Sequence, residues 1–581
     1  MNKYIFIIAI CGFLSLVAFT KKHTTVNDKP KYISREQAYQ NKYVMQCSPD
    51  WSKLNSDILA DGITILPGWG NYKWEINTTK DSAGLYFQQG INMYYSFHII
   101  EAMGSFKKAE QFETGNAMIY WAQALSYGPN INDFEYSFTP DAYAAAQKAV
   151  NLSANCTPKE KALINAMAVR YTSDSTVSRA SLNEKYTAAM AKAYAAFPAD
   201  ADIAALYADA MMLLHPWRYW KHNGDPETWT PLITTVLEKA IKETPLHPGA
   251  NHYYIHMVEA SGNPGRALES ANRLAYLMPE VSHMVHMPSH IYIRTGLYSQ
   301  GMKANEMSLK GYHDYLELYP EVGNNAPLYL IHNLHMQATC ALMGAGYSYS
   351  EKSAVDTRES FDTSFLSFPA PLGNYVQYVY MTPVFNQVRF GKWDAILQTP
   401  SIEEGHVFAN YLQHWAKGLA HARMNNIVAA KKELQYIKDH LSDPDMLVIM
   451  EPYNAPADAG KIAAKMLEGF IFEQEGKFQE SISALKEAVT FEDALIYNEP
   501  SDWLLPARQY LGAVLIKAKL YGEAEKIFKE DLTINPANHW SLKGLHTVLL
   551  KLKKNTDAAK IKLQLDKSIS TEDMKYLPVV Y

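Results

Sequence analysis

Small and aromatic residues follow a helical pattern from Leu85 onward. Gly90 is followed by Ala102, Phe106 and Ala109 at offsets of 12, 16 and 19. Tetratricopeptide repeats place small and aromatic residues at these offsets, because the two antiparallel helices of a hairpin approach closely only where side chains are small. The pattern therefore predicts helix-turn-helix hairpins.

A regular period relates the turns of successive hairpins, and its length is about 34 residues, that of tetratricopeptide repeats. Gly262 and Gly296 are separated by one such period, and Gly391 and Asn425 repeat this spacing. We expect a left-handed backbone at such turns, which glycine and then asparagine adopt most easily. Gly476 marks the same turn once more. Hairpins with this period stack into a solenoid.

The C-terminal part has the plainest repeats. Gly469 and Phe478 fit one repeat, and Gly512 and Phe528 fit the next. The two glycines are further apart than one period, so roughly nine residues are inserted near 497–503. A last helix pair is expected over residues 539–567. The predicted fold class is all-α, a tetratricopeptide-type solenoid (superhelix) of roughly ten hairpins.

The N-terminus has the pattern of a secretory signal. Lys3 precedes a mostly apolar run that ends at Phe19, and this run is too short to cross a bilayer comfortably. Cleavage is expected after Ala18 or Thr20. The expected segments are a signal peptide (1–20), an irregular N-terminal linker or cap (21–80), N-terminal helical repeats (81–245), a histidine-rich repeat core (246–360), C-terminal repeats (361–570) and a tail (571–581).

Charge and cysteine content narrow the functional classes. The formal net charge is -6, from 54 basic and 60 acidic residues, and no long basic run is present, which argues against nucleic acid as a partner. Removal of the signal would leave Cys47, Cys156 and Cys340, a sparse set that makes neither a disulfide framework nor a thiolate metal site. The protein is expected to be exported to the bacterial periplasm or cell surface. Membrane association is expected only through the N-terminal signal, if it is retained.

Two histidine pairs are the most informative feature of the chain. His252 and His256 are four residues apart, as are His286 and His290, and corresponding members of the two pairs are one full repeat apart. On a helix this spacing places both rings of a pair on one face. Because the repeat copies the pair onto the neighbouring helix, four imidazoles are expected to converge.

The register of the repeat predicts where these rings point. The first helix of a tetratricopeptide hairpin lines the concave face, and the turn glycines place His283 and the two pairs at groove-facing positions. The predicted ligand-binding groove contains His252, His256, His283, His286, His290, His332 and His335. The loop from His215 to Trp220 is a candidate rim for this groove.

Two hypotheses explain the cluster, and the residues leave both open. In the first, His252, His256, His286 and His290 bind a divalent transition metal, since imidazole suits zinc, copper, nickel and iron. Glu259 could then act as a base or hold a ligand, and His247, His332 and His335 are further candidates. A metal-dependent enzyme using zinc, copper or iron would follow if a coordination position stays open.

In the second hypothesis the histidines recognise a partner without metal. An exported scaffold that binds a protein or peptide in the groove is the leading expectation, and no cofactor is then certain. A glycan-binding protein of bacterial polysaccharide uptake is a further alternative, because 39 tyrosines and 11 tryptophans could stack on sugars. We find no phosphate-binding glycine loop and no nucleophile elbow.

Four segments resemble a family of bacterial tetratricopeptide repeat proteins. Family members carry HPGAxHYxIH, HMPSHIYxRxG, PHNLH and YxEPxDWxxPxRxxLG, which stand here as 247–256, 286–296, 331–335 and 497–512. Ile331 replaces the proline of the third segment. The resemblance covers most of residues 85–560. It implies the helical-repeat fold, and the family brings no defined activity.

Overall fold

The computed structural model describes Trp51 and residues 56–134, 140–318, 326–450, 453–569, 574 and 577–580. These residues form α-helices and short 3-10 helices, and within them the only β-type pairings are two isolated bridges. The predicted all-α class is confirmed. The apolar N-terminal run, Cys47 and most of the expected tail lie outside the described residues.

The first half of the chain, residues 56–318, contains α2 (Ser56–Gly62), α3 (Asp81–Tyr95), α4 (Ile99–Phe112), α5 (Ala117–Ser126), α6 (Pro140–Leu152), η1 (Ser153–Asn155), α7 (Pro158–Ala168), α8 (Arg179–Ala196), α9 (Ala201–Met212), α10 (Thr230–Glu243), α11 (Pro248–Val258), η2 (Pro264–Ala267), α12 (Leu268–Leu277), α13 (Ser282–His286), α14 (Pro288–Arg294) and α15 (Tyr298–Leu318). We call this the N-terminal half.

The second half, residues 326–580, contains α16 (Ala326–Gly344), α17 (Tyr347–Glu359), η4 (Thr363–Ser367), α18 (Leu372–Tyr380), α19 (Thr382–Arg389), α20 (Trp393–Gln398), α21 (Val407–Arg423), α22 (Ile427–His440), η5 (Pro444–Leu447), α23 (Pro456–Gln474), α24 (Phe478–Asp493), α25 (Ala507–Lys517), α26 (Tyr521–Ile534), α27 (His539–Lys551) and α28 (Asn555–Lys567). We call this the C-terminal half.

Glycine–aromatic contacts hold the hairpins together where the repeat pattern predicts them. A Cβ atom on Gly90 of α3 would lie 2.4 Å from Cε1 of Phe106 on α4. Phe528 of α26 fits between Gly512 of α25 and Gly544 of α27 in the same way, with its Cζ 2.4 and 2.3 Å from the two added Cβ atoms. Each aromatic ring therefore occupies the space that a side chain would need, which explains the small residues at these crossings.

The predicted turn conformation occurs at four of the five positions. Gly296, Gly391, Asn425 and Gly476 have φ angles of 76°, 63°, 63° and 76°. The expectation for Gly262 is wrong, since this residue is not among the positive-φ glycines. Gly262 instead packs against a second turn, where a Cβ on Gly224 would lie 2.7 Å from its backbone nitrogen. The close approach therefore requires glycine at position 224, whereas a Cβ on Gly262 would lie 3.7 Å from the Gly224 carbonyl oxygen, an ordinary contact.

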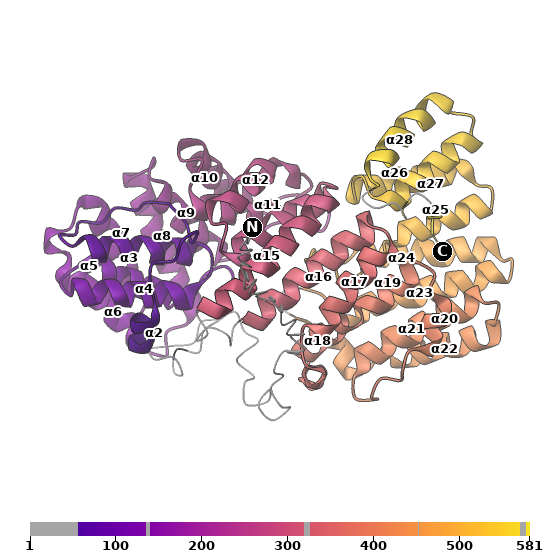
Figure 1. Ribbon diagram of the computed structural model, residues 1–581, viewed down its shortest axis with the longest axis horizontal. Helices are drawn as coiled ribbons and strands as arrows, with labels where there is room; N and C mark the ends of the chain where they lie inside the picture. Colours follow the sequence, from indigo (N-terminus) through magenta and orange to yellow (C-terminus); the bar gives the residue numbers. More distant parts are fainter. Residues whose placement is uncertain are drawn as a thin grey trace, which may run out of the picture.

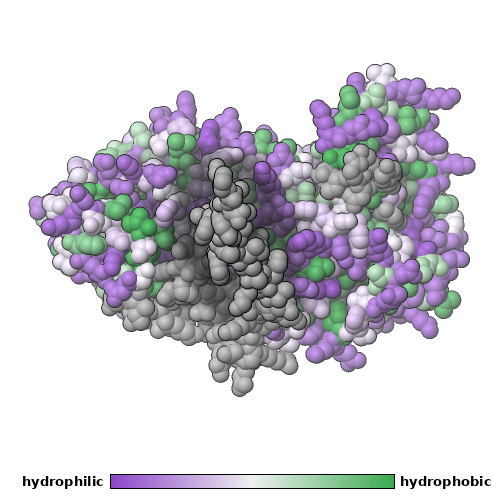
Figure 2. All heavy atoms as spheres, viewed as in Figure 1, coloured by the Kyte–Doolittle hydropathy of each residue, from purple (hydrophilic) through white to green (hydrophobic). Residues whose placement is uncertain are grey.

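The helices follow the chain from the indigo end of the molecule to the yellow end (Figure 1). Two large hydrophobic cores lie along this path, one between Leu59 and Ile291 and one between Leu342 and Ala558. On the face shown in Figure 2, hydrophilic residues predominate and hydrophobic ones are scattered among them. No helix within the described ranges combines the length and apolar character that a bilayer crossing requires.

The C-terminal half also returns to the N-terminal half at points far apart in sequence. The Tyr298 hydroxyl donates to the Pro536 carbonyl oxygen at 2.9 Å. His222 Nδ1 donates to the Leu495 carbonyl oxygen at 3.0 Å. Leu495 belongs to the connection between α24 and α25, residues 494–506, which we call the insertion loop. The predicted insertion therefore reaches across to the first half of the chain.

Candidate metal centre

Six histidines from four neighbouring helices meet in two groups of three. We call His252, His256 and His283 the first triad, and His286, His290 and His332 the second triad. The rings come from α11, α13, α14 and α16. Within each triad, one nitrogen from each ring lies within 4.8 Å of the other two. This is the separation expected of donors that share one ion.

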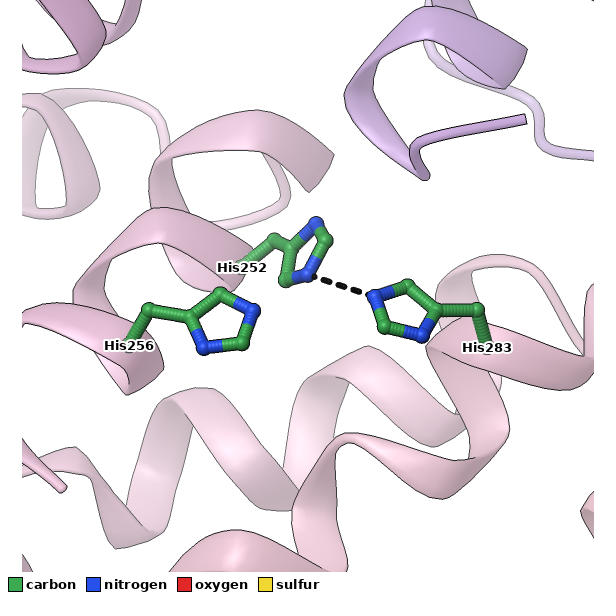
Figure 3. A group of neighbouring side chains, drawn as sticks. All are labelled: His252, His256 and His283. Atoms are coloured by element: carbon green, nitrogen blue, oxygen red, sulfur yellow. Dashed lines mark hydrogen bonds between the residues drawn. The ribbon is translucent and has the colours of Figure 1, made fainter. Parts of the chain in front are cut away.

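The three rings of the first triad face one another (Figure 3). His252 Nε2 lies 3.1 Å from His283 Nε2, and the His252 and His256 ring centres are 4.9 Å apart. His252 and His256 occupy successive turns of α11, as their spacing predicts. His283 comes from the first turn of α13, the short helix that opens the next repeat.

The second triad repeats this arrangement one hairpin later. His286 Nε2 lies 2.9 Å from His290 Nε2, which lies 3.5 Å from His332 Nε2. Pro288 divides the expected single helix into α13 and α14, because proline has no N–H to continue the hydrogen-bond ladder. Met287 between them keeps a helical backbone, so His286 and His290 still share a face.

The two triads are adjacent. The ring centres of His256 and His290 are 5.7 Å apart, and those of His283 and His286 are 6.1 Å apart. His256 and His290 are corresponding members of the two in-register pairs. The prediction that the period of the repeat brings these pairs together is therefore confirmed.

Two carboxylates complete the cluster. Glu259, which caps α11, places Oε1 3.3 Å from His256 Nδ1 and Oε2 2.9 Å from His290 Nδ1. Glu259 thus connects the two triads. Glu499 of the insertion loop also forms an ion pair with His290 Nδ1, and its side chain is 7% exposed. Glu259, His290 and Glu499 form a third group of converging ligand atoms.

Hydrogen bonds to Nδ1 fix the direction of several rings. His252 Nδ1 donates to the Tyr95 carbonyl oxygen at 2.7 Å. His286 Nδ1 donates to Asn305 Oδ1 at 2.6 Å, and the amide is oriented by its own Nδ2, which donates to the Gly301 carbonyl oxygen at 2.9 Å. Because Nδ1 carries the proton in both rings, each Nε2 presents a lone pair to the cluster. Metal-bound histidines are typically held by such an outer hydrogen bond.

Burial sets the electrostatics of the triads. It lowers the pKa of His252, His283 and His286 well below the ordinary value, and the neighbouring imidazoles add to this effect. Burial and the His290 ring likewise lower the pKa of His332 to about 3. These four rings are therefore neutral at physiological pH, which is the form that binds a metal ion.

His290 and the carboxylates behave differently. Burial opposes a charge on His290, but Glu499 and Glu259 outweigh it and raise the pKa of His290 to about 10. For Glu259, burial is outweighed by His290 and His256, which lower its pKa to about 2. For Glu499, burial prevails over the attraction of His290 and raises the pKa to about 7. His290 and the Arg294 guanidinium are thus the positively charged groups that the two carboxylates face.

Aromatic side chains cover the first triad. The Phe97 ring centre lies 4.4 Å from the His252 ring and 5.6 Å from the His283 ring. Trp217, in the loop that the sequence suggested as a rim, contacts the His256 ring edge-on with centres 5.2 Å apart. Tyr329 of α16 contacts His283, with ring centres 5.1 Å apart. These rings place the triad in an apolar surrounding.

The expectation that the histidines line an open concave groove is wrong. His252 and His286 are 0% exposed, and His256, His283 and His290 are 5% exposed. Two features of the chain explain the burial. Phe97 at the end of α3 covers one side, and the insertion loop closes against His290. The repeat pattern describes successive hairpins only, so it could not include these distant segments.

Comparisons with known proteins add similarity at the level of overall shape alone. No family model matches the chain, and no curated protein matches it. The similar solved structures include the human IFIT1 dimer with m7Gppp-AAAA, at 13% identity and a TM-score of 0.30, covering 92% of this chain and 95% of that one. They also include yeast Tom70, at 12% identity and a TM-score of 0.29, covering 85% and 93%. At these scores the likenesses carry no functional argument, and the helical-repeat fold rests on the structure itself.

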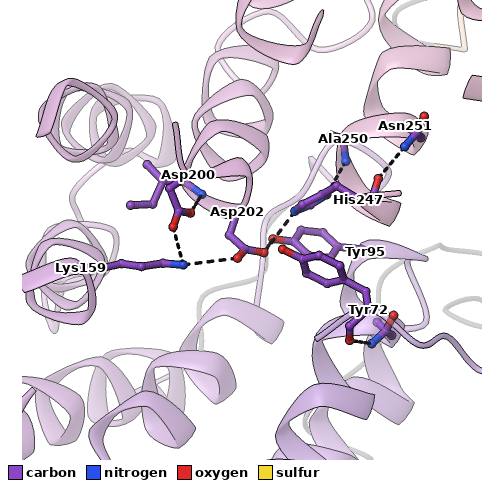
Figure 4. Close-up of polar contacts among 10 residues, drawn as sticks. Tyr72, Tyr95, Lys159, Asp200, Asp202, His247, Ala250 and Asn251 are labelled. Atoms are coloured by element: carbon purple, nitrogen blue, oxygen red, sulfur yellow. Dashed lines mark hydrogen bonds and ion pairs between the residues drawn. The ribbon is translucent and has the colours of Figure 1, made fainter. Parts of the chain in front are cut away.

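His247 lies outside the triads and has a structural role. Its Nδ1 accepts the Ala250 backbone N–H at 2.9 Å, which caps α11, and its Nε2 donates to Asp202 Oδ1 at 3.1 Å (Figure 4). The Tyr95 hydroxyl donates to the same Asp202 oxygen at 3.0 Å. Both ring nitrogens are thus occupied, so His247 is not available as a metal ligand. The network instead fixes the start of the helix that carries the first triad.

His335 and Glu499 also differ from expectation. His335 is 1% exposed and belongs to none of the groups of converging ligand atoms among the described residues. Its ring packs against Tyr378, with centres 5.6 Å apart. Glu499 was not among the candidates, because it lies in a segment that the repeat pattern treats as an insertion. The resemblance segment that begins at Tyr497 contains this glutamate and was the one sequence signal for it.

Proposed function

We propose that this protein binds two transition-metal ions, one in each histidine triad, and acts as a metal-dependent enzyme. The observation that carries the proposal is the common orientation of the rings. His252 and His286 hold their Nδ1 protons on fixed oxygen acceptors, so their Nε2 lone pairs face the Nε2 atoms of neighbouring rings inside a buried cluster. A metal ion in each triad would bind these lone pairs, because neutral imidazole nitrogen is a common metal ligand.

A network of hydrogen bonds between the imidazole rings, without metal, is the competing explanation of the same geometry. His283 Nε2 could donate to His252, and protonated His290 could donate to His286. His256 Nε2 would remain without a hydrogen-bond partner. His290 Nε2 has only one proton, so it could not also donate a hydrogen bond to His332. The buried His256 Nε2 would thus stay unpaired in the first triad, at about 1–3 kcal/mol, and the part-buried His332 Nε2 would lack a donor in the second. A metal ion in each triad would instead bind His256 Nε2 and His332 Nε2 as ligands.

The donor set indicates which ions fit. Six imidazoles and two carboxylates suit zinc, copper, iron or nickel, whereas magnesium and calcium prefer oxygen donors. Cys340, although buried, is absent from the groups of converging ligand atoms in the described part of the chain. Thiolate-bound centres are therefore not part of the proposal.

Three protein ligands for each ion favour a catalytic centre. Structural zinc sites usually have four protein ligands, whereas catalytic sites have three and an open position for water or substrate. Glu259 and Glu499 lie beside the second triad, where a carboxylate can accept a proton from a metal-bound water.

Spectroscopy of the cobalt-substituted protein tests both parts of this proposal. We expect two equivalents of Co²⁺ per chain, with d–d bands that shift on addition of azide because each ion has an open position. Replacement of His252 and His256 together by Ala should reduce binding to one equivalent, since the second triad remains intact. His414→Ala is the matched control, because this ring pairs with Glu433 away from the cluster.

Three outcomes would reject the proposal. Absence of Co²⁺ binding at micromolar metal would reject the centre itself. Unchanged stoichiometry in the His252→Ala/His256→Ala variant would show that the ions bind elsewhere. Bands that do not respond to azide would indicate a closed, structural site.

A further inference from the structure

The insertion loop contributes more to the proposed centre than one carboxylate. Three of its residues contact the N-terminal half. Glu499 forms an ion pair with His290, and the Tyr497 ring lies 5.0 Å from the Arg294 guanidinium carbon. The Leu495 carbonyl oxygen accepts from His222. This short segment therefore joins the C-terminal half to α14, the helix that carries His290.

The same loop is firmly fixed to the C-terminal half. The Asn454 side chain donates to the Ile496 carbonyl oxygen and accepts from the Ile496 backbone N–H, both at 2.8 Å. Trp503 is 2% exposed, and its ring centre lies 5.0 Å from that of Trp415 and 5.4 Å from that of Phe385. Glu499 is thus held by the C-terminal half and is presented to a histidine of the other half.

The contacts of the insertion loop with the N-terminal half involve charged or polar groups. Elsewhere the two halves share an apolar cluster, in which Met302 packs with Cys340, Ala341 and Ala345. Glu499 meets Glu259 at His290, and two carboxylates so close together repel each other unless positive charge lies between them. The Arg294 guanidinium, which packs on the Tyr497 ring, supplies positive charge to both carboxylates. Two divalent ions supply four positive charges, so they attract the loop more strongly.

We propose that Glu499 couples metal binding to docking of the insertion loop, so that filling the centre fixes this loop against α14. This inference rests on the proposed metal centre. Glu499 acts as a positioning residue, because it orients His290 through Nδ1 while Nε2 of that ring faces the ion. Linkage requires the effect to be reciprocal: whatever factor docking contributes to metal affinity, metal contributes to docking.

Hydrogen exchange of the full-length protein, measured with and without bound Zn²⁺, tests the coupling. Zn²⁺ should slow exchange of backbone amides at residues 495–500 by about 10-fold or more, because metal binding stabilises the docked state. In the Glu499→Gln variant, Zn²⁺ should bind about 10–100-fold more weakly, as is typical when an outer partner of a metal ligand is lost. The protection at residues 495–500 should then disappear even at saturating Zn²⁺.

Asp493→Asn is the matched control for loss of a carboxylate next to the loop. Asp493 pairs with Arg508 and its side chain is 45% exposed, so its replacement should change neither Zn²⁺ affinity nor protection. Equal exchange at residues 495–500 of the wild type with and without Zn²⁺ would overturn the coupling but leave the metal centre standing. Unchanged metal-dependent protection in Glu499→Gln would overturn the role of Glu499. Failure of the wild type to bind Zn²⁺ or Co²⁺ would overturn both proposals.

Discussion

Phe97 has a backbone conformation that is unfavourable for its residue type. Its φ angle is 60°, and it ends α3 in a motif where Phe97 N–H donates to the Tyr94 carbonyl oxygen and His98 N–H donates to the Met93 carbonyl oxygen. Glycine is the usual residue at this position. Phenylalanine there costs about 1–2 kcal/mol. Contact of its ring with the first triad is the physical reason for accepting that cost.

Replacement of Phe97 by glycine tests both the cost of its backbone conformation and the contribution of its ring. The backbone strain is relieved, but the ring packed on the histidines is lost, and truncation of a buried phenylalanine costs about 3–5 kcal/mol. We expect a net loss of about 2–4 kcal/mol in the free energy of unfolding of the metal-loaded protein. Metal extraction by a chelator should also become faster. Urea unfolding and chelator competition measure the two quantities.

Lys519→Gly is the control for the free-energy cost of the left-handed backbone conformation alone. Lys519 has a φ angle of 61° in the same terminal motif after α25, and its side chain is exposed. This substitution should stabilise the protein by about 1 kcal/mol and leave metal release unchanged. A Phe97→Gly variant that behaves like Lys519→Gly would show that the ring contributes nothing to the centre.

At the scale of helices, the repeat pattern predicted packing well and side-chain accessibility poorly. The small residue at Gly90 and the aromatic ring at Phe106 are local in sequence, so their contact follows from hairpin geometry. The in-register histidine pairs were placed on neighbouring helices for the same reason. Their burial depends on Phe97 and on Glu499, which lie outside the repeats that carry the histidines. A local period cannot encode such contacts.

A glycine substitution tests the packing account of the hairpins. Ala at position 544 would place a Cβ 2.3 Å from Cζ of Phe528, and Gly512 confines that ring on the other side. We expect Gly544→Ala to lower the free energy of unfolding by about 1–3 kcal/mol despite the better helix propensity of alanine. Thermal or urea unfolding provides the measurement.

Gly522 of α26 provides the matched control. Nothing lies within 4 Å of its added Cβ, so Gly522→Ala should be neutral or stabilising by up to about 1 kcal/mol. If both alanine variants were equally stable, close packing at the hairpin crossings would not be the reason for glycine there.

For the whole molecule, the proposed export depends on residues outside the described ranges. Lys3 and the apolar run that follows it predict a signal that is removed after Ala18 or Thr20. Expression in a bacterium with two membranes should therefore give a periplasmic protein. Intact-mass measurement should place its N-terminus at residue 19 or 21. A full-length cytoplasmic product would contradict this prediction.

The organisation of the whole chain also explains why Glu499 was not predicted as part of the site. Glu499 reaches His290 only because the C-terminal half returns to the N-terminal half, and their separation in sequence spans several repeats. His247, by contrast, was close to the pairs in sequence but is used as a helix cap. Nearness along the chain and nearness in space diverge at these two residues.

A crystal structure of the metal-loaded protein, with anomalous diffraction measured at the absorption edge of the bound metal, tests the central claim most directly. The account predicts two anomalous peaks, one among His252, His256 and His283 and one among His286, His290 and His332, with Glu259 and Glu499 beside the second. A cluster without either peak in metal-replete crystals, with the imidazoles hydrogen-bonded to one another or to water, would contradict it.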